Sequence, residues 1–307
     1  MSIVDYSIVV PVYNAEGSLD VLNKSICHFF ESKQYSYEII YVNDSSIDRS
    51  WDILKEIKKT NACITIINFS KNFGQHAATM CGFKHAKGKF VVTLDDDMEA
   101  HPNEVEKLIL SQQKSNADLV YGVYRKLNQS FLRRILTNFY KLISKVEGSK
   151  KGKGSSFRLL KYSLAKKLSD NHKHFVFIDE LCLWYTSNID FVNTESNKEF
   201  IDKRRYNIAS LFSLTTNLIM FSSTYPLKIV TNIGMALATI NFGSGTYFLI
   251  KKIFYKISYD GYASLIVSIL FSTGLIIFCI GILAQYISKL LKTTNNAPSY
   301  SESEVIC

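Results

Sequence analysis

The sequence predicts an α/β protein: a doubly wound, mostly parallel sheet, then amphipathic helices and a C-terminal two-helix membrane hairpin. Three observations predict this. Short β-branched runs alternate with helical patterns in the first third of the chain, as in doubly wound sheets. One of these runs, VVTLDDDME, ends in a group of carboxylates. Near the C-terminus, two long apolar stretches carry no charged residue.

The elements follow one another in regular order. Apolar runs that predict strands lie at 6–12, 38–42, 64–69, 89–94 and 118–123. Helical patterns lie between them, at 18–30, 47–58 and 75–85, and Pro102 is placed to open a further helix at its first turn. In such sheets, ligands bind at the carboxyl ends of the strands. The acidic cluster lies at one of these ends.

Composition narrows the class of protein. The chain has 307 residues, is 47% hydrophobic and carries a formal net charge of +9. That charge favours an anionic partner: nucleic acid, an acidic membrane or a phosphorylated substrate. The six cysteines show no CxxC spacing and no paired histidine cluster, so neither a structural zinc site nor a disulfide scaffold is expected. The N-terminus lacks the basic and apolar regions of a signal peptide, which predicts a cytoplasmic start.

Membrane features begin after the predicted sheet. Residues 130–146 predict a basic amphipathic helix at the bilayer surface, or an ordinary surface helix, and 206–225 predict a second interfacial helix. The uncharged stretches 229–250 and 262–288 are each long enough to cross a hydrocarbon core about 30 Å thick. We therefore expect a large cytoplasmic domain at 1–205, a hairpin at 226–288 and a disordered tail at 289–307. Flanking lysines and arginines favour cytoplasmic termini.

The acidic cluster has two interpretations. If the segment from Leu94 to Glu99 is extended, Asp95, Asp97 and Glu99 share one face, because side chains alternate along a strand. Three oxygen ligands at a strand end suit Mg²⁺ or Mn²⁺. The alternative is an exposed acidic turn before a helix, where carboxylates favour the helix dipole.

Several motifs in a fixed order carry a family resemblance. VVPVYNAE, VNDSSID, NFSKNFGQHAATMCGF, TLDDDMEAHP, SFRLL, SSTYPLKI and GILAQYI together resemble the family-two glycosyltransferases of GT-A fold. Within that family the sequence is most similar to the polyprenyl-phosphate glycosyltransferases, which include dolichyl-phosphate mannose synthase, the bactoprenol glucosyltransferases and the undecaprenyl-phosphate aminoarabinose transferase. The resemblance covers nearly the whole chain. It implies an inverting, membrane-bound enzyme that moves a sugar from a UDP-linked donor to undecaprenyl phosphate for cell-surface glycans. It also implies an inner-membrane location and is compatible with a homo-oligomer.

The resemblance also implies roles for single residues. The metal would bind at Asp95 and Asp97, with Glu99 where the family often has Gln. Arginine forks bind phosphate bidentately, which suits the diphosphate and the acceptor. The expected nucleotide-sugar residues are Pro11, Tyr13, Glu16, Val42, Asp44, Asp95, Asp96 and Asp97, with Asp96 in the variable middle position of the motif. The expected acceptor-phosphate residues are Arg125, Arg158 and Arg205, of which Arg125 is also expected to be catalytic.

The chain departs from the family pattern at a few positions. Ser155 and Ser156 replace the usual Gly and Asp, and Glu199 stands where many relatives carry Arg. These changes leave sugar specificity and acceptor geometry open. Two other readings also remain: a transferase that elongates a lipid-linked saccharide on an alcohol, and an inactive membrane scaffold. Nucleic-acid binding would explain the charge but neither the hairpin nor the acidic strand end.

Overall fold

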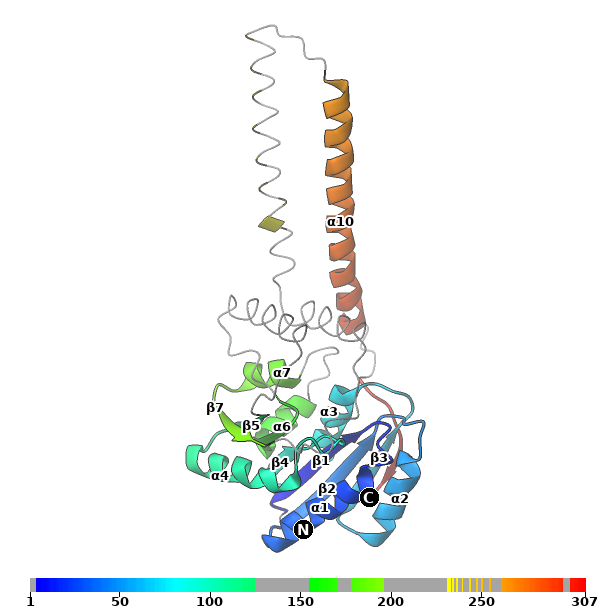
Figure 1. The fold of residues 1–307 in the computed structure, drawn as a ribbon, viewed down its shortest axis with the longest axis vertical. Helices are drawn as coiled ribbons and strands as arrows, with labels where there is room; N and C mark the ends of the chain where they lie inside the picture. Colours follow the sequence, from blue (N-terminus) through cyan, green and yellow to red (C-terminus); the bar gives the residue numbers. More distant parts are fainter. Residues whose placement is uncertain are drawn as a thin grey trace. The chain divides into compact units, whose positions relative to one another are not determined.

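The structure is a computed structural model, shown in Figure 1, that describes residues 4–124, 155–170, 178–195, 261–294 and 299–307. It also describes isolated positions between 231 and 254. The chain divides into two compact units, Met1–Ser213 with Pro298–Cys307, and Leu214–Ala297. The C-terminal residues therefore return to the unit that begins the chain.

The first unit alternates strands and helices along most of its length. Its elements are β1 (Tyr6–Val12), α1 (Leu19–Ser32), β2 (Tyr37–Asn43), α2 (Ser50–Thr60), β3 (Ile64–Phe69), α3 (Gln75–His85), β4 (Phe90–Thr93), the 3-10 helix η1 (Pro102–Glu104), α4 (Val105–Ser115), β5 (Leu119–Tyr124), β6 (Arg158–Lys161), α6 (Tyr162–Ser169), α7 (Ile178–Tyr185), β7 (Ile189–Thr194) and β8 (Glu302–Ile306).

In the described part of the chain the strands form one sheet, in the order β7-β5-β6-β4-β1-β2-β3-β8. β1 pairs in parallel with β2 and β4, and β2 in parallel with β3. β6 runs antiparallel between β4 and β5, and β8 runs antiparallel to β3. The prediction of a doubly wound, mostly parallel sheet is confirmed. The strand over 64–69 and the helix over 75–85 have the predicted bounds. The other predicted strands and helices of the first 124 residues agree with the structure to within a few residues.

Helices cover both faces of the sheet. Helices α1, α2 and α4 pack one apolar cluster against one face, and α3, α6 and α7 pack a second cluster against the other. Helix α3 lies especially close to β1, because a Cβ added at Gly82 would stand 2.2 Å from Val9 Cγ1. A glycine at this position lets the helix approach the strand. That close approach fixes α3 relative to the carboxyl end of β1.

The prediction of a disordered tail over 289–307 is wrong for its last residues. Glu302–Ile306 form β8, which pairs with β3 along the open edge of the sheet. Ile306 packs against the core, and the Tyr300 ring stacks on Phe69 with centroids 5.3 Å apart. Backbone pairing together with these two contacts orders a polar segment that carries no strong signal of its own.

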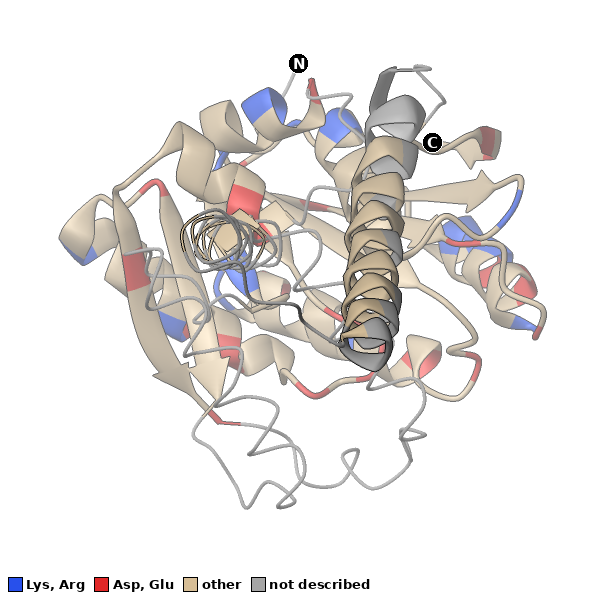
Figure 2. Ribbon diagram, turned by 90° about the horizontal axis from the view of Figure 1, so that it is seen from above, with Lys and Arg blue, Asp and Glu red and all other residues tan. Residues whose placement is uncertain are grey.

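The second unit contains α10 (Tyr262–Thr294), which extends beyond the predicted end at Ser288. From Tyr262 to Ser288, α10 carries no acidic or basic residue, and Lys289 and Lys292 follow near its end. In Figure 2 the coloured turns of α10 are tan, whereas the charged residues of the first unit are coloured largely on its helices and loops. Among the residues that the structure describes, we find no helix that combines the length and the hydropathy of a membrane span. The predicted helices at 130–146 and 206–225, and most of 229–250, lie outside the described residues.

Candidate functional site

The predicted site lies where three neighbouring parallel strands end. In the register of the sheet, Val12 of β1 pairs with Asn43 of β2, and Val9 of β1 pairs with Thr93 of β4. The segments that follow these strands, 13–16, 44–46 and 95–99, therefore emerge at one edge of the sheet. This is the edge at which open α/β sheets bind ligands.

The acidic segment is not extended, contrary to the alternation expected from the sequence. β4 ends at Thr93, a turn follows, and Met98 adopts a left-handed conformation with φ of 55°. Asp97 Oδ1 accepts a hydrogen bond from the backbone N–H of Glu99 at 3.0 Å, which closes this turn. The carboxylates are therefore displayed around a turn rather than along one face of a strand.

Asp95 is held by two side chains from other elements. Gln75 Nε2, at the start of α3, donates to Asp95 Oδ1 at 2.6 Å. Ser156 Oγ, just before β6, donates to Asp95 Oδ2. The backbone carbonyl of Ser156 in turn accepts from Thr93 Oγ1. Asp95 therefore has a defined orientation before any ligand is present.

Sequence reasoning missed both donors to Asp95. Gln75 lies in a stretch that carries the family resemblance, so that motif was the signal that could have found it. Ser156 was identified only as a departure from the family pattern. Its role depends on β6 pairing antiparallel to β4, in the register Thr93 with Arg158, which brings residue 156 beside Asp95. No local pattern in the sequence predicts that pairing.

Asp96 is a structural link as well as the middle residue of the motif. Its carboxylate Oδ2 accepts from the backbone N–H of Tyr13 at 2.9 Å, and its backbone carbonyl accepts from Ser18 Oγ at 2.6 Å. The side chain is buried. Asp96 therefore ties the acidic turn to the loop after β1, which contains the predicted nucleotide-binding residues.

The charges of the acidic turn act on Tyr124 at the end of β5. Burial, followed by the charges of Glu99, Asp95 and Asp97, raises the pKa of Tyr124 well above its ordinary value. These carboxylates therefore share one electrostatic environment. In the described part of the chain, the one trio whose ligand atoms all lie within 4.8 Å of one another is Cys81, His85 and Glu302. Asp95, Asp97 and Glu99 do not form such a trio, and their role as ligands of a divalent cation stays a prediction.

Two carboxylates are nevertheless enough for the expected cation. Mg²⁺ is usually held by one or two carboxylates together with substrate phosphates and water. Asp95, which two donors orient, and Asp97, in the same turn, supply oxygen ligands of this kind. The residues present fit a divalent cation that is completed by a diphosphate.

The loops that carry the predicted nucleotide-binding residues are held by hydrogen bonds from backbone N–H groups to carboxylate side chains. Asp44 accepts from the backbone N–H groups of Phe73 at 2.7 Å and Gly74 at 2.8 Å. Burial raises the pKa of Asp44, against the opposing effect of these two donors. Glu16 Oε2 accepts from the backbone N–H of Arg49 at 3.1 Å. Asp44 thus positions the loop before α3, and Glu16 joins the loops that follow β1 and β2.

Three other predicted nucleotide-binding residues have different exposures. Tyr13 is 44% exposed and can therefore contact a ligand. Pro11 pairs with Val42 in the sheet, and the Val42 side chain is completely buried. Val42 can therefore reach a nucleotide only through its backbone.

Arg158 does not have the environment predicted for a phosphate ligand. It is 3% exposed, its Nη1 donates to Asp179 Oδ1 at 2.8 Å, and its guanidinium lies over the Tyr121 ring at 5.8 Å. A buried, paired guanidinium has little surface left for a phosphate. We therefore correct the prediction: Arg158 joins β6 to α7 rather than contacting the acceptor. Arg125 and Arg205, like Glu199, lie outside the described residues.

His76 is a further residue near this edge to which sequence reasoning gave no role. It follows Gln75 in the first turn of α3. Desolvation by the surrounding protein, and then the positive charge of Arg158, lower the pKa of His76 to about 4, and the charge of Asp179 opposes this shift. Part of the residue remains exposed to solvent. At neutral pH, His76 is an uncharged imidazole beside the donor to Asp95.

Comparison with known proteins decides the family. Residues 7–182, more than half of the chain, match glycosyl transferase family 2. The chain belongs to glycosyl transferase family 2. A second match, to the GtrB C-terminal hairpin, covers residues 225–290. The protein is thus a glycosyltransferase with a hairpin domain after its catalytic domain.

Relatives of this family 2 enzyme match along nearly its whole length. The prophage bactoprenol glucosyl transferase homolog of Escherichia coli (strain K12) is 29% identical over 297 residues, which cover 96% of this chain and 97% of that protein. The putative glycosyltransferase CsbB of Bacillus subtilis (strain 168) is 28% identical over 301 residues, covering 96% and 90%.

Solved structures support the GT-A-like fold alone. Mannosyl-3-phosphoglycerate synthase from Rubrobacter xylanophilus aligns with a TM-score of 0.54 and 11% identity, covering 76% of this chain and 75% of that one. Glucosyl-3-phosphoglycerate synthase from Mycobacterium tuberculosis, in complex with phosphoglyceric acid, aligns with a TM-score of 0.51 and 16% identity, covering 71% and 78%.

Proposed function

We propose that this family 2 glycosyltransferase moves a sugar from a UDP-linked donor to undecaprenyl phosphate at the cytoplasmic face of the inner membrane. The observation that carries the proposal is the acidic turn at the end of β4, in which Gln75 and Ser156 orient Asp95. The matched hairpin at 225–290 and the relatives named for bactoprenol support a lipid acceptor.

The donor would occupy the edge between β1, β2 and β4. Asp95 and Asp97 would hold Mg²⁺ or Mn²⁺, which when bound offsets the negative charge of the diphosphate leaving group. Asp44 and Asp96 keep the surrounding loops in place through their bonds to the backbone of Phe73, Gly74 and Tyr13. A donor bound here meets a preorganised site, which reduces the ordering cost of binding.

The acceptor explains why a dedicated base is not required. A lipid monophosphate has a second pKa around 6, so it arrives ionised at neutral pH. One of its oxygens forms a bond to the anomeric carbon as the bond from that carbon to the nucleoside diphosphate breaks, with inversion. The neutral His76 places no positive charge in the first turn of α3, next to the Gln75 that donates to Asp95. Arg125 and Arg205 remain our proposed contacts for the acceptor phosphate.

The membrane part of the proposal rests on the sequence and on the matched hairpin. The stretches 229–250 and 262–288 carry no charge and would cross the bilayer as two helices, with 130–146 and 206–225 at its surface. Both termini would be cytoplasmic. Oligomerisation through the helices is part of the same proposal.

The experiment that tests the proposal is sugar transfer by the purified full-length protein. A panel of labelled nucleotide sugars is offered with undecaprenyl phosphate and, separately, with a lipid-linked saccharide, in the presence of Mg²⁺ or Mn²⁺. We expect a sugar-phosphate lipid product from one donor. Asp97→Asn should lower its rate about a hundredfold or more, because the leaving group loses its charge stabilisation.

Asp52→Asn, on the exposed side of α2, is the matched control and should keep the wild-type rate. Transfer to the lipid-linked saccharide with none to the bare lipid phosphate would overturn the acceptor assignment. It would favour an enzyme that elongates a glycan on an alcohol. Absence of transfer to either lipid would favour an inactive scaffold.

A further inference from the structure

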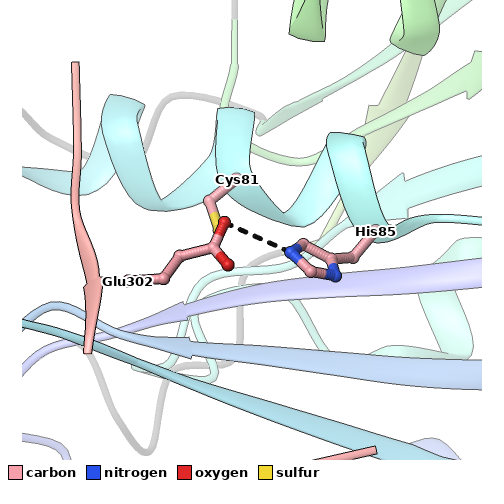
Figure 3. A group of neighbouring side chains, drawn as sticks. All are labelled: Cys81, His85 and Glu302. Carbon is pink, nitrogen blue, oxygen red and sulfur yellow. Dashed lines mark hydrogen bonds and ion pairs between the residues drawn. The ribbon is translucent and has the colours of Figure 1, made fainter. Parts of the chain in front are cut away.

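A second group of metal-ligand side chains lies on α3, away from the acidic turn. Cys81 and His85 are four residues apart on the helix and so share a face, and Glu302 of β8 approaches them from the sheet edge (Figure 3). Cys81 Sγ lies 3.5 Å from Glu302 Oε1, and His85 Nε2 lies 3.3 Å from the same oxygen. The three ligand atoms all lie within 4.8 Å of one another.

An irregularity in β8 creates this arrangement. Asn68 pairs with Glu304 and the next residue of β3, Phe69, pairs with Glu302, so Ser303 is an extra residue on β8. Such a β-bulge reverses which face the following side chains occupy. Ile306 therefore packs toward the cluster that contains α1 and α2, whereas Glu302 faces α3 on the opposite side of the sheet. Without the extra residue, Glu302 would point to the same face as Ile306.

We propose that Cys81, His85 and Glu302 bind Zn²⁺ and that this ion fastens the C-terminal strand to α3. A thiolate, an imidazole and a carboxylate are the ligand types that zinc takes in proteins, and three protein ligands leave a fourth position for water. Mg²⁺ and Ca²⁺ prefer oxygen ligands throughout, so the Cys81 sulfur argues against them. Binding forms a sulfur–zinc bond and releases the thiol proton to solvent.

Before a metal binds, the electrostatics of the trio keep the Cys81 thiol protonated. Burial, and then the charge of Glu302, raise the pKa of the Cys81 thiol. Without a cation, a thiolate here would be poorly solvated and close to a carboxylate. A divalent ion between the two ligands removes that repulsion. His85, at the end of α3, can offer Nε2 to the same ion.

The competing interpretation is an ion-paired cluster without a metal. Lys84 Nζ lies 3.9 Å from Glu302 Oε1, and His85 already contacts the same oxygen. The Lys84 side chain is 61% exposed, so it can swing into solvent when a cation replaces it. The geometry alone allows both states, and a cobalt titration separates them.

The zinc site is distinct from the donor site and does not rest on the proposed function. Cys81 lies six residues after Gln75, about 9 Å further along the helix axis. Asp95 and Asp97 offer only oxygen ligands, so a metal–thiolate signal cannot come from them.

The test uses the full-length protein, stripped of metal with a chelator and titrated with Co²⁺. We expect a thiolate-to-cobalt charge-transfer band that Zn²⁺ abolishes at one equivalent per chain. Cys81→Ser should remove the band, and Glu302→Gln should weaken cobalt binding about tenfold or more. Two matched controls, Cys63→Ser on an exposed cysteine and Glu304→Gln on the same strand, should titrate like the wild type.

A second measurement follows the strand itself. Zn²⁺ should slow amide hydrogen exchange over 302–306 in the wild type and in Glu304→Gln, but not in Glu302→Gln, a near-isosteric change at a partly exposed position. The absence of a thiolate band in the wild type, or a band that survives Cys81→Ser, would overturn the proposal. So would exchange over 302–306 that Zn²⁺ leaves unchanged.

Discussion

Asp95 shows how a single carboxylate is prepared for a ligand by its neighbours. Gln75 donates to one of its oxygens and Ser156 to the other, and the two donors come from different elements. Donors of this kind hold a ligand side chain in one orientation and so tune metal affinity. The two residues are positioning residues for the proposed cation.

Replacing either donor should weaken the affinity of the enzyme for its metal by a measurable amount. For Gln75→Ala and Ser156→Ala we expect the Mn²⁺ concentration that gives half-maximal transfer to rise about tenfold, because Asp95 loses its fixed orientation. The rate at saturating Mn²⁺ should change less than this concentration does. Gln113→Ala, on the exposed side of α4, is the matched control. A fall in the saturating rate with no change in the Mn²⁺ requirement would contradict the assigned role.

His76 carries a pH dependence whose sign follows from its pKa. The folded-state pKa is about 4, below the ordinary value of 6.5 that applies to the unfolded chain. As the pH falls from about 6.5 toward 4, the unfolded chain takes up a proton that the folded chain does not, so stability decreases. Above about pH 7, His76 contributes no pH dependence.

The variant His76→Asn should therefore reduce the loss of stability in acid. We expect the difference in Tm between about pH 7.5 and about pH 5 to be smaller for the variant than for the wild type. Thermal unfolding of both proteins in the same detergent measures it. Equal differences in Tm would show that His76 is not protonated more readily in the unfolded chain.

At the scale of elements, β8 contributes to the stability of the sheet, because within the described residues it covers the edge strand β3. Its two faces differ, because Ile306 packs on the core whereas Val305 is 38% exposed. Covering an edge strand also removes a surface that could pair with other chains.

Replacing Ile306 and Val305 with alanine should therefore have unequal effects on the free energy of unfolding. Ile306→Ala should lower the free energy of unfolding by about 1 kcal/mol or more, because a partly buried side chain loses apolar contacts. Val305→Ala should change it by less than about 0.5 kcal/mol. Denaturant unfolding of the two variants provides the comparison. Similar losses for both would mean that β8 does not pack on the core as the structure shows.

At the scale of the whole molecule, the pairing of β8 with β3 constrains the membrane topology. Residues on both sides of the 214–297 unit belong to the same compact unit, since 298–307 return to the sheet. A chain that leaves a folded unit and rejoins it crosses a bilayer an even number of times. The proposed hairpin of two helices satisfies this condition, and a single crossing does not.

Cysteine labelling tests that constraint. Cys63 precedes β3, Cys307 follows β8, and both are exposed. A membrane-impermeant thiol reagent should label both in inside-out vesicles and neither in intact spheroplasts, because we expect both on the cytoplasmic side. Variants that retain only Cys63 or only Cys307 allow the labelling of each cysteine to be measured separately. Labelling of Cys63 and Cys307 from opposite sides would contradict the return of β8 to the sheet.

Local pattern by itself determined the doubly wound sheet, its order of strands and helices up to β5, and the edge where a site would lie. These follow from the sequence because apolar periodicity and turn residues act over short distances. The family and its glycosyltransferase activity were also readable, since motifs such as NFGQH and TLDDD keep their order along the chain.

Tertiary structure decided the features that depend on residues far apart in the sequence. The turn after β4 replaced the predicted alternation of carboxylates, Arg158 proved to be buried against Asp179, and Ser156 reached Asp95 through the pairing of β6. The cysteine spacing argued against a zinc site, yet folding brings Glu302 to Cys81 across 221 residues of sequence. Strand pairing and burial select such contacts from many that the sequence allows, because their free energy arises only once the sheet has assembled.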